Sequence, residues 1–91
     1  MLMMVKYGCD NPADCGRFSL AKKGDQIVLI QNGVFWAIDD KIDSYLDKSI
    51  EIYAIAPDFF ARGYSEEVSK VPLLSYDGFI ELLENAEQNL G

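Results

Sequence analysis

The chain has 91 residues, of which 49% are hydrophobic and 25% charged, so we expect a single domain over residues 1–91 with one small core. Its 8 basic and 15 acidic side chains give a formal net charge of −7, which argues against direct binding of nucleic acid by this chain alone. Two cysteines and no histidine are too few ligands for a structural zinc site, so no metal is expected, and no histidine base is present to activate a serine or cysteine.

The N-terminal segment is apolar but short, and it predicts a strand over residues 2–7. It lacks the basic leader of a signal peptide, and no apolar run approaches the ~18 residues that a membrane span needs. We therefore expect a cytoplasmic protein without membrane contact, in which thiols stay reduced. A turn at residues 8–12 leads into a helix that begins at Pro12 and ends before Gly24.

A continuous apolar run at residues 27–30 predicts a strand that is buried on both faces. After a tight turn, a helix is expected over residues 34–47, with an apolar stripe at helical spacing. Phe35 and Trp36 fall off this stripe. They either pack locally or form an exposed patch that meets a partner.

Residues 50–56 form the third predicted strand, because they are apolar and end at polar turn residues. Pro57 fits the first turn of a short helix, and Gly63 fits a left-handed residue at its end. Ser65 starts another brief helical turn.

The fourth predicted strand, residues 71–74, contains Pro72 and is therefore at a sheet edge or irregular. A final helix follows, capped by Ser75 or Asp77. Its inner face is expected to carry Phe79, Leu82, Leu83, Ala86 and Leu90.

Strands alternate with helices along the chain, which implies right-handed crossovers and a parallel sheet covered by helices. The predicted fold is an α/β three-layer sandwich with a mainly parallel four-stranded sheet, of the flavodoxin-like or Rossmann-like type. Residues that follow the strands meet at the carboxyl edge of such a sheet, where helix N-termini favour anions and thiolates. The residues expected at this rim are Gly8, Cys9, Gln31, Asn32, Pro57, Asp58 and Ser75.

The two thiols are the candidate catalytic groups. Cys9 lies between a strand end and a helix N-terminus, where the helix dipole favours a thiolate, whereas Asp10 and Asp14 disfavour it. An unreactive residue in a turn is the alternative. Cys15 falls in the first turns of the helix, where buried packing is the alternative to chemistry.

Arg62 is one of two arginines, and its guanidinium can bind a carboxylate or the last carbonyls of a helix. It is either a structural brace or a contact to a partner or an anion.

Asn32-Gly33 primarily indicates a turn, and its second interpretation is a polar contact at the crevice. The candidate binding residues at the rim are Gln31, Asn32, Gly33, Asp58, Arg62 and Gly63. No glycine-rich phosphate loop is present, so no cofactor is expected, and phosphoryl or acyl transfer is poorly supported.

Two blocks of sequence carry a resemblance to a known family. The first is Ile27-Val28-Leu29-Ile30-Gln31-Asn32-Gly33-Val34, and the second runs from Ile52 to Gly63; Tyr76 and Phe79, before an acidic helix, support them. In order and spacing these blocks resemble the DsrH/TusB family, within the wider DsrE/DsrF/DsrH group. The resemblance implies a DsrE-like α/β sandwich in a cytoplasmic relay of persulfide sulfur, toward 2-thiouridine at the tRNA wobble position or in sulfur oxidation.

The resemblance also implies a complex with two sister subunits of the DsrE/DsrF (TusC/TusD-like) type, one of which carries the principal reactive cysteine. The predicted function is therefore a non-catalytic or weakly catalytic subunit of a sulfur relay. One alternative is a persulfide-carrying sulfurtransferase that uses Cys9 or Cys15. Another is a homodimeric binding or scaffold protein outside sulfur metabolism, held together by Phe35 and Trp36.

Overall fold

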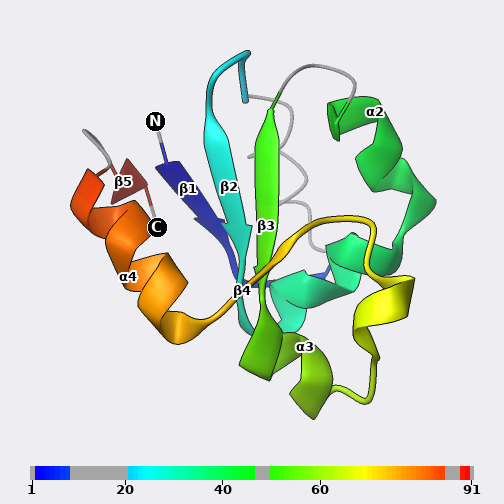
Figure 1. Cartoon of the computed structure of the whole chain (residues 1–91). Coiled ribbons are helices and arrows are strands. Elements are labelled where there is room, and N and C mark those ends of the chain that lie inside the picture. Colours follow the sequence, from blue (N-terminus) through cyan, green and yellow to red (C-terminus); the bar gives the residue numbers. More distant parts are fainter. Residues whose placement is uncertain (1, 9–20, 47–49, 86–88, 91) are drawn as a thin grey trace.

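The computed structural model describes residues 2–8, 21–46, 50–85 and 89–90. Its sheet has five parallel strands in the order β4-β3-β2-β1-β5 (Figure 1). The strands are β1 (Leu2–Val5), β2 (Gln26–Leu29), β3 (Glu51–Ile55), β4 (Leu73–Leu74) and β5 (Asn89–Leu90). The helical elements are η1 (Gln31–Ile38), η2 (Asp40–Ile42), α2 (Asp43–Leu46), α3 (Ala56–Ala61), η3 (Glu66–Val68) and α4 (Tyr76–Asn85). The predicted parallel α/β sheet is confirmed, and all four predicted strands form.

The fifth strand is a correction to the sequence prediction. Leu90 was expected on the inner face of the final helix, whereas it pairs with Met3 in the sheet, next to the pair of Asn89 with Leu2. A strand of two residues shows no periodicity of its own, and the spacing of Leu90 from Leu83 also fits a helix face. The predicted helix over residues 12–23, with Cys15, and the turn that holds Cys9 fall largely outside the described residues.

The path of the chain through the sheet determines which helices cover which face. From β1 to β4 each strand is added on the same side of the preceding one, so right-handed crossovers place η1, η2, α2 and α3 on one face. The step from β4 to β5 returns across the whole sheet, and its helix α4 lies on the opposite face (Figure 1). The described helices thus form the two outer layers of the predicted sandwich.

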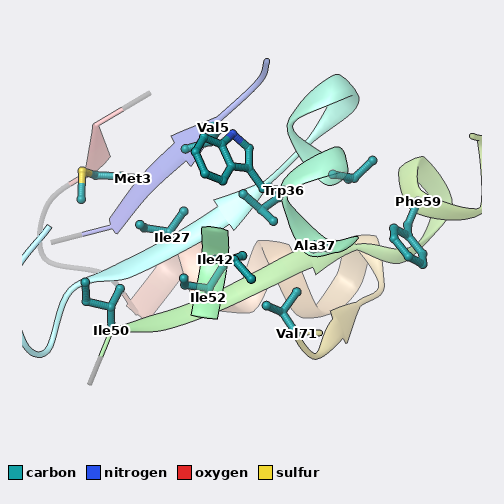
Figure 2. Packing of buried hydrophobic residues seen from close by; sticks show 13 residues of the cluster. Met3, Val5, Ile27, Trp36, Ala37, Ile42, Ile50, Ile52, Phe59 and Val71 are labelled. Carbon is teal, nitrogen blue, oxygen red and sulfur yellow. The ribbon is translucent and has the colours of Figure 1, made fainter. Parts of the chain in front are cut away.

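The segment after β2 is a 3-10 helix, η1, with three residues per turn. Its buried residues accordingly repeat every three positions: Gly33 with Trp36, and Val34 with Ala37. Trp36 is 1% exposed. It lies among the side chains of the core (Figure 2), so the interpretation of Trp36 as part of an exposed partner patch is wrong and the local-packing alternative holds. Phe35 is half-buried, and its ring packs edge-on against Tyr64 with centroids 6.0 Å apart.

Asp39 divides the helix that was predicted over residues 34–47. Its backbone is extended (φ −92°, ψ 134°), and its side-chain Oδ1 accepts a hydrogen bond from the main-chain N–H of Lys41 at 2.8 Å. This bond caps a new helical start, because an aspartate at that position satisfies an N–H that the helix leaves free. The segment is therefore η1, η2 and α2 in succession, and the prediction of one continuous α-helix is wrong.

The larger hydrophobic cluster lies between the sheet and the helices η1, η2 and α3 (Figure 2). Trp36 and Phe59 are its largest fully buried side chains, and the ring of Phe59 stacks on Tyr64 with centroids 5.2 Å apart. Ile27 and Leu29 from β2 and Ile52 from β3 are also fully or almost fully buried. The apolar runs of the two central strands thus supply the centre of the core, as the sequence predicted.

The smaller cluster lies on the face that α4 covers. Leu2, Val28 and Ile55 are its buried residues, and partly buried hydrophobic side chains pack against them: Ile30, Leu74, Phe79, Leu82 and Leu83. The Oγ of Ser75 accepts a hydrogen bond from the main-chain N–H of Gly78 at 3.1 Å, which confirms Ser75 as a cap of the final helix. Pro72 precedes β4, which is an edge strand as its proline predicts. Within the described residues, no helix is long and apolar enough to span a membrane.

Candidate functional site

The segments that follow β2, β3 and β4 meet at the carboxyl edge of the sheet, as the parallel topology requires. Five residues join these segments by hydrogen bonds, and we call them the rim network: Gln31, Asn32, Asp58, Arg62 and Tyr76. Four of the five are candidate rim or crevice residues from the sequence. The structure therefore brings together residues that lie up to 45 positions apart in the chain (31 to 76).

Asp58 connects all three segments. Its Oδ2 accepts a hydrogen bond from the main-chain N–H of Gln31 at 2.7 Å, and its Oδ1 accepts one from the hydroxyl of Tyr76 at 3.2 Å. Pro57 occupies the first turn of α3, as predicted, and fixes the start of the helix on which Asp58 lies. Gln31 has a φ of 50°, in the left-handed region that residues with a side chain rarely adopt. The bond to Asp58 stabilises that conformation.

Arg62 connects α3 to the beginning of η1. Its Nε donates to Oδ1 of Asn32 at 2.9 Å, and its Nη1 donates to the main-chain carbonyl of Asp58 at 2.9 Å. The second contact lies one turn back along α3, so the guanidinium closes the end of that helix. These bonds are those of a structural brace, the first of the two interpretations that the sequence allows.

Within the rim network a carboxylate, that of Asp58, lies next to a phenol, that of Tyr76. The negative charge of Asp58, together with the hydrogen bond between them, raises the pKa of Tyr76 above its ordinary value. The neutral phenol is favoured because a tyrosinate would face a carboxylate of the same charge. Tyr76 is thus a hydrogen-bond donor at neutral pH, and Asp58 and Asn32 are acceptors. The network has the chemistry of a positioning device for loops, since its described polar groups bond to one another.

The remaining candidates of the rim have different positions. Gly33 is buried, and a Cβ on it would lie 1.9 Å from the main-chain oxygen of Val5, so this glycine is needed for close packing of η1 on β1. Gly63 has a φ of 88° and follows α3, as predicted for a left-handed residue at a helix end.

The two candidate catalytic residues, Cys9 and Cys15, lie outside the described residues. Among the described residues, no group of acidic, cysteine or histidine side chains could hold a metal ion.

Tyr76 is the member of the rim network that was not singled out from the sequence as a site residue. The available signal was its position: it directly follows Ser75, which was expected at the carboxyl edge. A single exposed tyrosine at a helix start does not indicate a site, however, and its hydrogen bond to Asp58 forms only because the start of α4 lies near the start of α3 at the carboxyl edge.

A second feature is a shallow groove of ≈ 210 Å³ beside the first half of β3. Its lining residues are Ile50, Glu51, Ile52, Tyr53 and Pro72. Glu51 Oε2 accepts hydrogen bonds from Gln26 Nε2 at 2.8 Å and from the hydroxyl of Tyr53 at 3.3 Å. Burial, followed by the charge of Glu51, raises the pKa of Tyr53. This groove lies toward the amino ends of the strands and contains none of the predicted site residues.

The sequence matches a family model described as "DsrH like protein" over residues 13–89. Protein TusB of Pectobacterium atrosepticum is 39% identical over 72 residues, which cover 76% of this chain and 76% of that protein. Protein TusB of Escherichia coli strain K12 is 33% identical over 66 residues, which cover 69% of this chain and 70% of that protein.

Solved structures are similar as well. The solution NMR structure of protein Tm0979 from Thermotoga maritima matches with a TM-score of 0.76 and 51% sequence identity, over 100% of both chains. A second NMR structure of the same protein, described as a "putative sulfur transferase", matches with a TM-score of 0.71 and 53% identity, over 96% of this chain and 94% of that one.

Proposed function

Because this chain belongs to the DsrH family, we propose that it is a subunit of a cytoplasmic sulfur relay that assists persulfide transfer toward 2-thiouridine at the wobble position of tRNA. The observation that carries the proposal is the similarity to proteins named TusB over most of the chain. Its partners are then sister subunits of the DsrE/DsrF (TusC/TusD-like) type.

The composition of the chain supports a subunit without catalysis of its own. It has no histidine, and its described rim residues form hydrogen bonds among themselves. The net charge of −7 favours contact with proteins over contact with the phosphate backbone of tRNA. In this proposal the rim network holds the loops at the carboxyl edge in the shape that a partner subunit recognises.

A second candidate is a persulfide carrier, which the description of the Thermotoga maritima relative favours. In that reaction the thiolate of Cys9 or Cys15 attacks the outer sulfur of a donor persulfide. A new sulfur–sulfur bond forms on the cysteine, the bond within the donor persulfide breaks, and the donor leaves as a thiolate.

Complementation of a strain that lacks the gene distinguishes the two candidates. The amount of 2-thiouridine in its tRNA is measured by mass spectrometry after expression of the wild-type chain or of the double variant Cys9→Ala/Cys15→Ala. Restoration by both supports the non-catalytic subunit, whereas restoration by the wild type alone supports the carrier. If the strain that lacks the gene contains as much 2-thiouridine as its parent strain, both roles in tRNA thiolation are contradicted.

The partner is tested by purifying the tagged chain from its own cells. Co-elution of DsrE-like and DsrF-like chains in a fixed ratio is the expected result. Sedimentation of the chain purified alone provides the matched comparison, and a homodimer found in the cells without sister subunits would contradict the proposed complex.

A further inference from the structure

Asn32 of the rim network is followed by Gly33 in the chain, and Asn-Gly is the dipeptide most susceptible to deamidation. In this reaction the main-chain nitrogen of the glycine attacks the side-chain carbonyl carbon of the asparagine. A carbon–nitrogen bond forms, ammonia leaves, and the product is a cyclic succinimide. Water then opens the ring to aspartate or to isoaspartate. Glycine favours the attack because it has no side chain to obstruct it.

Both reacting groups of this pair are held in place. The main-chain N–H of Gly33 donates a hydrogen bond to the carbonyl of Ile30 at 2.8 Å, as part of the turn that begins η1. The carboxamide oxygen of Asn32 accepts a hydrogen bond from Nε of Arg62 at 2.9 Å. The attack needs a Gly33 nitrogen that has lost its proton and an Asn32 side chain that has rotated over it, so each bond opposes one requirement.

Arg62 is itself held, since its Nη1 donates to the carbonyl of Asp58 at 2.9 Å. The guanidinium is therefore oriented by α3 before it reaches Asn32, and a hydrogen bond from a charged donor is stronger than one between neutral groups. Gly33 adds a further restraint, because the space beside it is filled by the main chain of Val5.

We propose that Asn32 is a latent deamidation site and that Arg62 keeps it intact. When the hydrogen bond between Arg62 and Asn32 is lost, the carboxamide of Asn32 is free to rotate. The Gly33 nitrogen can then attack it, and the carboxamide releases ammonia. The aspartate product retains the main chain and presents a carboxylate to Arg62. The isoaspartate product lengthens the main chain by one methylene group next to Gly33, where the contact with Val5 leaves no room. Formation of isoaspartate therefore breaks the packing of η1 on β1.

The test uses the full chain, kept in mildly alkaline buffer and sampled over days. Conversion of Asn32 is followed by peptide mass spectrometry, and isoaspartate by methylation with an isoaspartyl methyltransferase. The native wild type is compared with the same chain in urea, a measurement that needs no variant. We expect deamidation of Asn32 to be at least about tenfold slower in the native chain, as the loss of one charge-assisted hydrogen bond implies.

Arg62→Ala is the direct variant, and we expect it to raise the native rate by about tenfold. Lys23→Ala removes the same charge at the opposite edge of the sheet, before β2, and should leave the rate unchanged. Tyr76→Phe removes a different bond of the rim network and should also leave it unchanged. The proposal is overturned if native and urea-denatured wild type react at equal rates, if Arg62→Ala is no faster than wild type, or if Tyr76→Phe accelerates the reaction as much as Arg62→Ala does.

Discussion

The carboxylate of Asp58 accepts a hydrogen bond of 2.7 Å from the main-chain N–H of Gln31, and this bond joins the residue after β2 to the helix after β3. The same carboxylate accepts a hydrogen bond from the hydroxyl of Tyr76, which lies in the helix after β4. One side chain thus connects the ends of three strands. The arrangement of the carboxyl edge depends on this aspartate more than on any other described residue of the rim network.

We expect Asp58→Ala to lower the free energy of unfolding by about 2 kcal/mol, because both hydrogen bonds end on a charged acceptor. Urea denaturation followed by circular dichroism measures the change. Glu67→Ala, in the exposed segment η3, is the control and should change stability by less than about 0.5 kcal/mol. Equal stability of Asp58→Ala and wild type would show that the two bonds contribute nothing.

Gln31→Gly should stabilise the chain by up to about 1 kcal/mol. A residue with a side chain is about 1–2 kcal/mol less stable in the left-handed region than in the right-handed one. Glycine removes this cost, but it also gives the unfolded chain more conformational freedom, which offsets part of the gain. The φ of 50° at Gln31 is the basis of this expectation. Thermal unfolding of Gln31→Gly and Gln31→Ala, side by side, measures it, and a lower melting temperature for Gln31→Gly than for Gln31→Ala would contradict it.

Gly33→Ala should destabilise the chain by about 3 kcal/mol, at the upper end of the usual cost of overpacking, because its new Cβ would meet the main-chain oxygen of Val5 at 1.9 Å. Gly24→Ala is a matched control with a different cause of strain. Gly24 has a φ of 90°, but apart from Gly24 and its chain neighbours no heavy atom of the described residues lies within 4 Å of the position that a Cβ would take, so about 1–2 kcal/mol is expected there. Urea denaturation of both variants gives the comparison, and a smaller loss at Gly33 than at Gly24 would refute the close packing.

The hydroxyl of Tyr76 should titrate above the ordinary tyrosine value because of Asp58, and Asp58→Asn should lower the pKa of Tyr76 toward it. A pKa that is raised in the folded chain means that the contribution of this bond to stability is complete below the ordinary value of about 10 and is lost as the pH rises through the folded-state value. NMR titration of the tyrosine ring carbons measures both variants. Tyr53, whose pKa is raised first by burial and then by Glu51, is the internal control and should not respond to Asp58→Asn.

The parts of the fold that follow from local patterns could be predicted from the sequence. The apolar runs at residues 27–30 and 50–56 lie within one residue of β2 and β3, because buried parallel strands are continuous in hydrophobicity. The convergence of Gln31, Asn32 and Asp58 also follows, since the carboxyl ends of parallel strands share one edge.

Other features depend on which of several possible local structures and packing arrangements forms, and local sequence patterns do not determine this. Trp36 falls off the stripe of an α-helix but lies on the buried side of a 3-10 helix, so its burial depends on which helix forms. The role of Tyr76 depends on where α4 packs, and β5 is too short to have a pattern. The prediction was therefore sound for strands β1 to β4 and for the location of the rim, and weak for β5 and for the helical segment after β2.

The order of the strands in the sheet distributes the helices unequally over its two faces, so the two helical layers differ in local stability. The two described crossovers with helices, β2 to β3 and β3 to β4, share one face, whereas α4, none of whose residues is fully buried, is the described helix on the other. Amide protons in α4 should therefore exchange with solvent through local opening, while those of β2 and β3 exchange only when the whole domain unfolds. Binding of another molecule over α4 would then slow this opening and stabilise the chain without any change in its structure.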